Sequence, residues 1–563
     1  MFSNQVLDEN KSLRQEWEER CSKLYEGKEF KATSASGIPV KPVYAPSDIE
    51  DTDFSETGMP GEYPYTRGIY PLHYQFQPWV SQPTLGYALP EQTRERRNLL
   101  VKEGMEGYFG VPSYNYIYDI VTKHGLDPDD PQARGFVGHG GVSLSTIEDM
   151  DRLFRDLPLD KVTASHNVEG ATLVELAMFI AYAEKRGFAQ EELRGISQNF
   201  LYHSAHDDVA VFPPKNSFKL MVEIIKYCSG NMPRWNPFTL NGYQMEEAGA
   251  NAVQEIAINL SAAIAIIKEC IKAGLSPDEF MPRFGFMAAT GSDFFEEVAK
   301  IRAERRMWAK IARERFGCKN PKSMQLRLHV HTAGRSLVPQ QPLNNVIRVA
   351  FQTLSAVFAG TNAIAPCAYD EPLALPTEQA ATLALRTQQI ILYETNIPNV
   401  SDPLAGSYYV EWLTNRVEEE ANKVIAEIEQ LGGYIQCWET GWFKRELERE
   451  NYNLWQSIDN GERIVVGVNK YVSKEEEKIP IFKFDPGIEE IAIERVQQFR
   501  AKRDNDKVKA ALQEMKEVAK KVNEDWPYGG DLIPSVIKAA RADATLGEMQ
   551  SVLKEIFGWG YAY

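Results

Sequence analysis

The chain has 563 residues, enough for several domains or one large barrel with extensions. Its net charge of −17 argues against nucleic acid or an anionic membrane surface as a main partner. No apolar run approaches the roughly 20 residues that span a bilayer. Six scattered cysteines without a C-x-x-C pair, and a polar start without a signal-peptide core, predict a cytoplasmic protein.

The first 64 residues predict a helix followed by an extended arm that contacts other subunits, because residues 31–64 are rich in Pro, Gly, Ser and Asp. From 65 to 411, short β-like runs alternate with helical patterns. The proposed strands are 107–113, 135–141, 162–168, 195–200, 237–242, 283–289, 326–332 and 357–365. One long helix is expected over 246–274, with Gly274 as its C-terminal cap.

Eight strands alternating with helices over this length predict a (β/α)8 TIM barrel of the α/β class. A doubly wound sheet is the rival fold, but no G-x-G-x-x-G follows a proposed strand. From 412 to 563 the sequence changes to charged amphipathic helices and predicts a helical extension. The segment 461–472 reads as a strand-like interruption of that extension.

Histidines gather where chemistry is expected in such a barrel, at the carboxyl ends of strands. Six of the eight lie in or just after a proposed strand: His139, His166, His203, His206, His329 and His331. The H-x-H pair at 329–331 has no companion carboxylate on the same segment, so no metal site is expected. With no G-x-S-x-G, P-loop or evident Schiff-base lysine, these patterns predict only a barrel enzyme with a polar mouth.

Several strings carry a more specific signal: "EYPYTRGIYP", "EVAKIRAERRMWAKI", "KNPKSMQLR", "DEPLALPTEQAA", "DPLAGSYYVE" and "GVNKY". In this order they resemble the large subunit of the methylmalonyl-CoA mutase family, which includes isobutyryl-CoA and 2-hydroxyisobutyryl-CoA mutases. The resemblance covers residues from about 38 to the C-terminus. It implies an intramolecular transferase that uses adenosylcobalamin, threads CoA along a barrel axis and rearranges an acyl carbon skeleton by radical chemistry.

The same resemblance implies partners. The family's cobalamin domain carries an axial histidine in D-x-H-x-x-G, and this chain has no histidine after His331. A separate small cobalamin-binding subunit is therefore expected, in a (large–small)2 heterotetramer. Whether a G-protein chaperone loads the cofactor stays open.

Site residues follow by matching positions. Relatives read roughly G-Y-H-M-x-E-A-G-A where this chain reads "GYQMEEAGA", so Gln244 replaces a histidine that donates to the thioester carbonyl. Glu247 and Glu371 match acids that contact the adenosyl ribose, and His331 replaces a glutamine near the adenosyl group. The resemblance also assigns Gly86 and Gly140 to the adenosyl site.

The acyl side departs from the family. Two pocket arginines of relatives become Gln77 and Gln82, and the residue that sorts acyl groups becomes Thr84; the Arg that pairs with a free carboxylate falls on Asp207 or Asp208. The implied substrate and CoA contacts are Tyr70, His73, Gln77, Gln82, Thr84, Thr163, Ser165, Asn167, Gln198, His203, His206, Arg283, Lys322, His329 and Asn362.

An Asp facing a carboxylate would repel it, so methylmalonyl-CoA is disfavoured. The smaller Thr84 and Gly140 favour a bulkier acyl-CoA, branched or alkyl- or aryl-substituted. If that group bears a carboxylate, His203, His206, His166 or His73 could replace the missing arginine. Two other readings stay open: a cobalamin-independent barrel isomerase or lyase, and an inactive assembly subunit.

Overall fold

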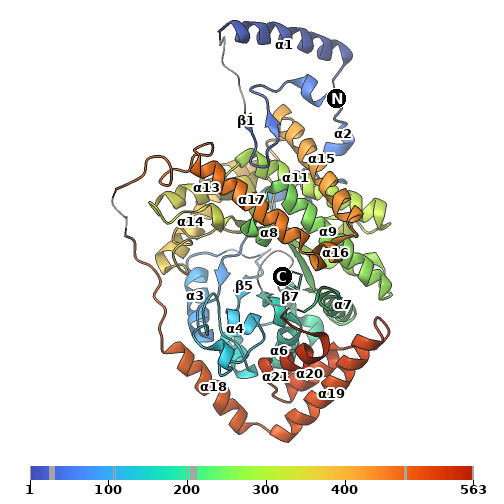
Figure 1. Cartoon of the computed structure of the whole chain (residues 1–563), viewed down its shortest axis with the longest axis vertical. Coiled ribbons are helices and arrows are strands. Elements are labelled where there is room, and N and C mark those ends of the chain that lie inside the picture. Colours follow the sequence, from blue (N-terminus) through green and yellow to red (C-terminus); the bar gives the residue numbers. More distant parts are fainter. Residues whose placement is uncertain are drawn as a thin grey trace.

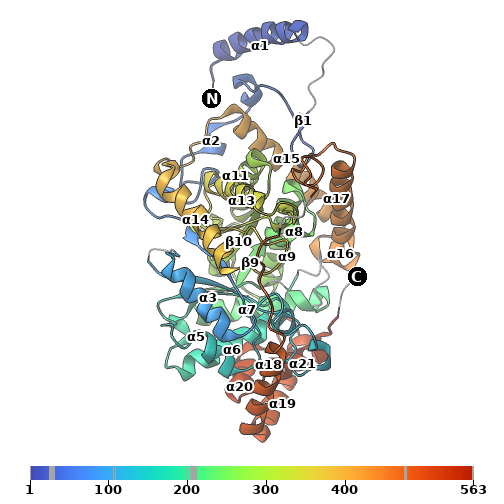
Figure 2. The ribbon, with the colours of Figure 1, turned by 90° about the vertical axis from the view of Figure 1, so that its left-hand side faces the viewer.

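The computed structural model describes residues 2–24, 32–105, 107, 110–199, 201–202, 212–474 and 478–560. The N-terminal helix α1 (Asn4–Leu24) stands apart at one end and buries none of its residues. At the opposite end lie the last four helices, α18 (Ile488–Lys502), α19 (Asn505–Glu524), α20 (Ile533–Arg541) and α21 (Leu546–Phe557) (Figures 1 and 2). The strands occupy the middle of the molecule.

Two five-stranded sheets form this centre, and every pairing within them is parallel. One sheet has the order β4 (Thr84–Leu85), β5 (Ser113–Ile117), β6 (Thr163–Asn167), β7 (Arg194–Ser197) and β8 (Trp235–Asn236). The other has the order β3 (Val80–Ser81), β12 (Ala363–Ala365), β11 (Leu328–Thr332), β10 (Phe284–Thr290) and β9 (Phe238–Asn241).

The two sheets approach each other at two prolines. Pro83 lies between β3 and β4, and Pro237 lies between β8 and β9. Proline has no N–H to donate to a ladder, so each proline marks a gap between the two sheets. The mixed α/β class and the parallel strands of the sequence prediction are thus confirmed.

Six of the proposed strand runs contain an observed strand, and two are wrong. The run 135–141 forms turns, with three glycines at positive φ. The run 107–113 precedes its strand, which begins at Ser113. The strand missed by the sequence reading is the proline-interrupted segment 80–85.

Two further expectations need correction. The expected helix 246–274 is divided into α8 (Gly242–Ala248) and α9 (Ala252–Lys272) at Gly249, whose φ is 126°. Gly274, at φ 90°, follows the end of α9 as a left-handed cap, as expected. The segment 461–472 holds an isolated bridge between Val466 and Lys470 instead of a strand.

Long helices cover the sheets and bind the C-terminal region to the centre. Helix α15 (Tyr408–Gln430) packs against α9 and α11 (Phe294–Lys310), and the buried Arg302 of α11 pairs with Asp402 and with Glu411 of α15. Helix α20 packs against α6 (Thr172–Lys185). These contacts place the charged helices of the last 150 residues directly on the sheet-bearing part.

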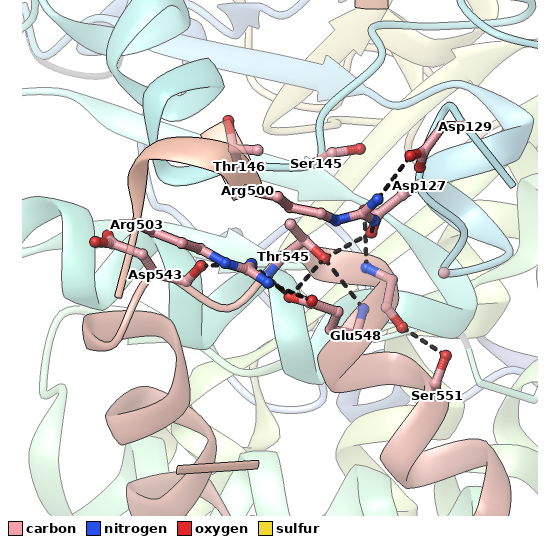
Figure 3. Close-up of polar contacts among 12 residues, drawn as sticks. Asp127, Asp129, Ser145, Thr146, Arg500, Arg503, Asp543, Thr545, Glu548 and Ser551 are labelled. Atoms are coloured by element: carbon pink, nitrogen blue, oxygen red, sulfur yellow. Dashed lines mark hydrogen bonds and ion pairs between the residues drawn. The ribbon is translucent and has the colours of Figure 1, made fainter. Parts of the chain in front are cut away.

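The terminal helices are also held by ion pairs (Figure 3). Arg500 of α18 reaches Asp127 at 2.5 Å and Asp129 at 2.6 Å, while Arg503 pairs with Glu548 of α21 at 2.5 Å. Asp127 also accepts hydrogen bonds from the Thr545 hydroxyl and the Gly547 amide. One buried carboxylate therefore fixes two helices to the loop that follows the short helix α4 (Ile120–Lys123).

Candidate functional site

Within each sheet the strands run parallel, so their carboxyl ends lie along one edge, and α8 begins directly at the end of β9. Asn241 caps α8, because its side-chain oxygen accepts a hydrogen bond from the Gln244 amide at 3.3 Å. The short helix then presents Tyr243, Gln244, Glu246 and Glu247, all partly accessible to solvent. Two predicted residues, Gln244 and Glu247, are therefore placed within one turn of each other.

Glu247 and Glu371 lie on either side of Gly334. The Glu247 carboxylate accepts a hydrogen bond from the Arg335 amide at 3.0 Å. A Cβ built on Gly334 would lie 3.6 Å from both Glu247 oxygens and 3.6 Å from Glu371 Cγ. Glycine here leaves a small space between two carboxyl groups contributed by segments that follow different strands.

The electrostatics of these two acids differ. Burial raises the pKa of Glu247, and amide donors from Arg335 and Gly334 oppose that rise. The pKa of Glu371 is raised to about 7, because protein surrounds the carboxyl group and because Glu247 and Asp370 are nearby anions. Glu371 nevertheless keeps a solvent-accessible surface. Glu371 is thus a solvent-accessible acid whose pKa is raised to about 7.

His331 completes this end of the site. Its ring lies 4.4 Å from the Tyr243 ring, and its Nε2 is 3.5 Å from the Thr84 hydroxyl. Its Nδ1 is 2.9 Å from the Thr332 carbonyl, which fixes the ring plane. Burial lowers the pKa of His331. The structure therefore brings Thr84, His331 and α8 together, from positions far apart in the sequence.

Below α8 lies a buried charge cluster that the sequence reading did not find. Lys300 Nζ is 2.5 Å from Glu255, 2.6 Å from Glu297 and 3.6 Å from Glu246. One cation is shared by three carboxyl groups in a desolvated position, and burial raises the pKa of Glu246 to about 7 and of Glu297 to about 8. The backbone neighbour of Glu247 is therefore tied to this cluster.

A polar interior runs along the strands away from this end. Gln198 Nε2 donates to Ser165 Oγ at 2.9 Å and to Asn115 Oδ1 at 3.1 Å, and Gln82 Nε2 donates to Ser113 Oγ at 2.6 Å. Thr163 pairs in register with Ser113, and Asn167 ends the same strand. The predicted residues Gln82, Thr163, Ser165, Asn167 and Gln198 thus lie on or next to neighbouring strands of one sheet.

Four arginines mark the opposite, amino ends of the strands. Ser165 pairs with Ile196 and Ile196 with Asn236, so these residues share a face, and Arg194 and Arg234 stand two positions before them. In the other sheet Arg283 and Arg327 stand two positions before Gly285 and His329. Arg194 lies in β7 and shares this face by strand alternation, whereas Arg234, Arg283 and Arg327 directly precede β8, β10 and β11 at the amino ends of those strands.

Only Arg283 belongs to the set predicted from the sequence. The others were missed, although Arg194 directly precedes a proposed strand and Arg327 lies at the start of another. Burial leaves Nε of Arg194 without a hydrogen-bond partner among the described residues. Lys322, on the short helix α12 (Pro321–Met324), is exposed, and α12 packs against the turn that holds Arg283.

The remaining predicted residues lie in segments that precede strands: Tyr70, His73 and Gln77 before β3, and Asn362 before β12. His73 is buried, its Nε2 lies 3.1 Å from the Arg67 carbonyl, and burial lowers its pKa to about 4. Gln77 donates to the Pro78 carbonyl at 2.9 Å, and Tyr70 precedes His73 in the same loop. Asn362 Oδ1 accepts from the Leu328 amide at 2.9 Å, which joins β11 to the start of β12.

The other histidines separate into different environments. His329 shares the β11 face of His331, and burial lowers its pKa to about 3. His166 faces α6, where its Nδ1 is 2.7 Å from the Glu175 carboxylate, so it points away from Ser165 and is removed from the candidates for an acyl contact. His203, His206, Asp207 and Asp208 lie outside the described residues.

Two glycines assigned to the adenosyl site differ in their surroundings. A Cβ on Gly86 would overlap the Ile117 carbonyl, so this glycine permits close backbone packing between neighbouring strands' ends. A Cβ on Gly140 would meet no atom within 4 Å, and its φ is 74°. Gly140 therefore borders open space.

Comparison with known proteins decides the family. The family model of methylmalonyl-CoA mutase matches residues 33–559. The chain belongs to the methylmalonyl-CoA mutase family. That family consists of coenzyme B12-dependent isomerases, and the recognition made from the sequence strings is confirmed.

Individual relatives of this mutase-family chain span it almost completely. It is 38% identical to the 2-hydroxyisobutanoyl-CoA mutase large subunit of Aquincola tertiaricarbonis over 98% of both chains. It is 37% identical to methylmalonyl-CoA mutase of Escherichia coli and 35% identical to the human mitochondrial enzyme, covering 75% and 73% of those proteins.

The described residues show neither a metal-ligand cluster nor a membrane-spanning helix. Within them, no three His, Cys, Asp or Glu side chains gather as metal ligands would. No helix in the described ranges combines the length and apolar character needed to cross a bilayer.

Proposed function

We propose that this chain is the large, catalytic subunit of an adenosylcobalamin-dependent acyl-CoA mutase that rearranges the carbon skeleton of a branched or bulky acyl group. The observation that carries the proposal is the pair Glu247 and Glu371 on either side of Gly334, in a chain that matches the mutase family over nearly its whole length. Gln244 stands three residues before Glu247 on the same short helix.

We further propose that the two sheets form one (β/α)8 barrel over residues 65–411, with 1–64 as a subunit-contacting arm and 412–563 as a helical extension. The support is the pairing of β12 with β3 and of β4 with β5, across the two residues that separate β3 from β4. The proline gaps at 83 and 237 then mark continuous barrel strands.

In this barrel the acyl-CoA chain would lie along the polar interior. The arginines at the amino ends suit the anionic phosphates of CoA, because guanidinium groups bind phosphate through paired N–H donors. The amides and hydroxyls of Gln82, Gln198 and Ser165 suit the amide-rich pantetheine arm. The thioester would then reach α8, where the Gln244 amide can donate to its carbonyl without carrying charge.

The residues around Gly334 fit the adenosyl group of the cofactor. Carboxylates accept hydrogen bonds from ribose hydroxyls, and the space above Gly334 lies between two of them. When bound, adenosylcobalamin supplies the hydrogen-abstracting radical chemistry of the reaction. Glu247 and Glu371 would hold the ribose, His331 and Tyr243 would border it, and the surrounding protein would exclude water from the reacting atoms.

For the acyl group, the open space beside Gly140 and the small Thr84 next to His331 support a substrate larger than isobutyryl-CoA. We propose alkyl- or aryl-substituted acyl-CoA, including succinyl- or malonyl-type thioesters. Whether such a group carries a second carboxylate depends on the segment 203–211, which lies outside the described residues.

A small cobalamin-binding subunit is the proposed partner, in a (large–small)2 assembly. Support comes from the relative named as a large subunit, which this chain covers over 98% of its length, whereas single-chain methylmalonyl-CoA mutases are covered over about three quarters. A G-protein chaperone is a further proposed partner. All six cysteines are free, which supports a reducing, cytoplasmic location.

The test is an anaerobic EPR experiment on the full chain with a cognate small subunit, adenosylcobalamin and a panel of methylmalonyl-, isobutyryl-, 2-hydroxyisobutyryl-, alkylsuccinyl- and arylsuccinyl-CoA. A coupled paramagnetic signal with a bulky thioester, and its loss in Glu247→Gln, is the expected result. Isomerisation without cofactor would establish a cobalamin-independent enzyme, and failure to bind the cofactor would identify an assembly subunit.

A further inference from the structure

One helix of the C-terminal region contacts the catalytic helix directly. Helix α17 (Trp442–Asp459) packs against α8 and crosses in front of it in Figure 1. Its buried residues, Phe443 and Leu447, are four positions apart, and Asn451 is the next member of the same stripe. A polar residue thus occupies a place on the packed face where periodicity predicts an apolar one.

Asn451 uses both ends of its amide. Its Nδ2 donates to the Ala248 carbonyl at 2.7 Å, at the last turn of α8, and its Oδ1 accepts from Arg335 Nη2 at 2.6 Å. Gly249 makes this approach feasible, because a Cβ there would overlap the Asn451 amide and the Leu447 carbonyl. The break between α8 and α9 is therefore shaped to receive α17.

Arg335 extends the contact to the acid that handles the cofactor. Its Nη1 donates to the Glu246 carbonyl at 2.5 Å, while its main-chain N–H donates to the Glu247 carboxylate at 3.0 Å. The carbonyls at 246 and 248 lie in the last turn of α8, where helix carbonyls depend on partners outside the helix ladder. Arg335 adds a side-chain donor to the Glu246 carbonyl, which also accepts from the Gly249 amide at 2.9 Å, and Asn451 supplies a donor to the Ala248 carbonyl. The two side chains thereby hold the last turn of α8.

We propose that Asn451 is a positioning residue: through Arg335 and the Ala248 carbonyl it holds α8 so that Gln244 and Glu247 face the reacting groups. This inference rests on the proposed mutase function, since it assigns those two residues to thioester and cofactor. The contact is made by a helix about 200 residues away in sequence. It makes the geometry of the site depend on the C-terminal region.

The test uses the full chain, alone and with its small subunit, in the variants Asn451→Leu and Asn451→Ala. Leucine extends the apolar stripe of Phe443 and Leu447, so Asn451→Leu keeps the packing of α17 but makes neither polar contact. Asn453→Ala is the matched control, because Asn453 is exposed on the same helix. Hydrogen–deuterium exchange, thermal midpoint, kcat and KM are measured for each.

We expect faster exchange in 242–250, an unchanged thermal midpoint in Asn451→Leu, and kcat lowered about ten- to a hundredfold, because small misplacements of catalytic groups cost that much. KM for the thioester should stay within about twofold, since the CoA handle binds at the distant amino ends of the strands. Asn453→Ala should match wild type.

The proposal would be overturned if hydrogen exchange in residues 242–250 were unchanged in both Asn451 variants, or if Asn453→Ala changed it equally. A lowered kcat without faster exchange would also overturn it. The exchange measurement needs neither cofactor nor substrate. If the wild-type chain shows no mutase activity but the Asn451 variants loosen α8, the proposed function fails while the structural link stands.

Discussion

The buried cluster around Lys300 makes a quantitative prediction about stability. The Lys300 side chain is 1% exposed and lies 2.5–2.6 Å from Glu255 and Glu297. Lys300→Met removes the cation that pairs with all three carboxyl groups. Removing one partner of a buried pair costs about 3–5 kcal/mol. An unfolding entropy near 2.1 cal/mol/K per residue amounts to about 1.2 kcal/mol/K for the whole chain. The loss of free energy divided by this entropy gives the shift of the thermal midpoint, which should fall by about 3–4 °C.

The sign of the pH dependence follows from the raised pKa values. In the native state the pKa is about 7 for Glu246 and about 8 for Glu297, whereas the ordinary pKa of a glutamate is 4.5. Between these pH values the native carboxyl groups keep protons that the unfolded chain has already lost. These groups therefore lower stability as pH rises from about 5 to about 8. Without Lys300 the native carboxyl groups hold protons still more tightly, so the loss should be greater at pH 8 than at pH 6.

The assay is thermal unfolding at both pH values by circular dichroism. Lys268→Met is the control, since Lys268 is an exposed lysine on α9. Its thermal midpoint should stay within about 1 °C of the wild-type value. Adding Glu255→Gln to Lys300→Met should recover part of the loss, because one unpaired carboxylate disappears. A midpoint unchanged at pH 8, or a loss equal at both pH values, would show that the cluster is not coupled as described.

Three further predictions follow from other contacts. Glu371 has a pKa of about 7, so adenosylcobalamin should bind more tightly as pH rises through 7, and Glu371→Gln should abolish that step in a spectroscopic titration at pH 6 and 8. Arg194→Gln should raise KM for acyl-CoA about tenfold, as loss of a charged hydrogen bond does, and leave KM for the matching acyl-pantetheine unchanged. Arg500→Met leaves the buried Asp127 without the guanidinium that pairs with it, so it should destabilise the terminal helices by about 1–3 kcal/mol. Proteolysis within residues 478–487 should then become faster. The control is Lys502→Met, which changes an exposed residue and should have neither effect.

The strand pattern shows where local sequence suffices and where it does not. Runs such as 283–289 and 326–332 were predictable, because apolar and small residues continue without interruption between turn signals. The segment 80–85 was hidden by Pro83, which removes a ladder donor but is tolerated at the gap between the two sheets. The run 135–141 was predicted as a strand although its glycine density favours turns, and three of its glycines adopt the positive φ that turns require.

The break at Gly249 has a cause that local sequence does not contain. The helical pattern of 246–274 is continuous by composition, and a glycine within it only weakens a helix. The chain turns there because Asn451 and Leu447 of α17 occupy the space that a side chain would need. Likewise, family resemblance identified Glu247 and Glu371, but only the fold shows that Gly334 lies between them.

Charge is distributed unequally along the proposed barrel axis, and this has a consequence for how a thioester binds. Arg194, Arg234, Arg283 and Arg327 stand at the amino ends, whereas Glu246, Glu247 and Glu371 gather beyond the carboxyl ends. A CoA molecule bound in reverse would bring its phosphates to the carboxylates, and like charges at close range in a partly desolvated site repel strongly. In a chain of net charge −17, the arginine end is therefore the place where an anionic handle is attracted. In the proposed function, the same asymmetry would present the neutral thioester to Gln244, an amide that needs no charge to hold it.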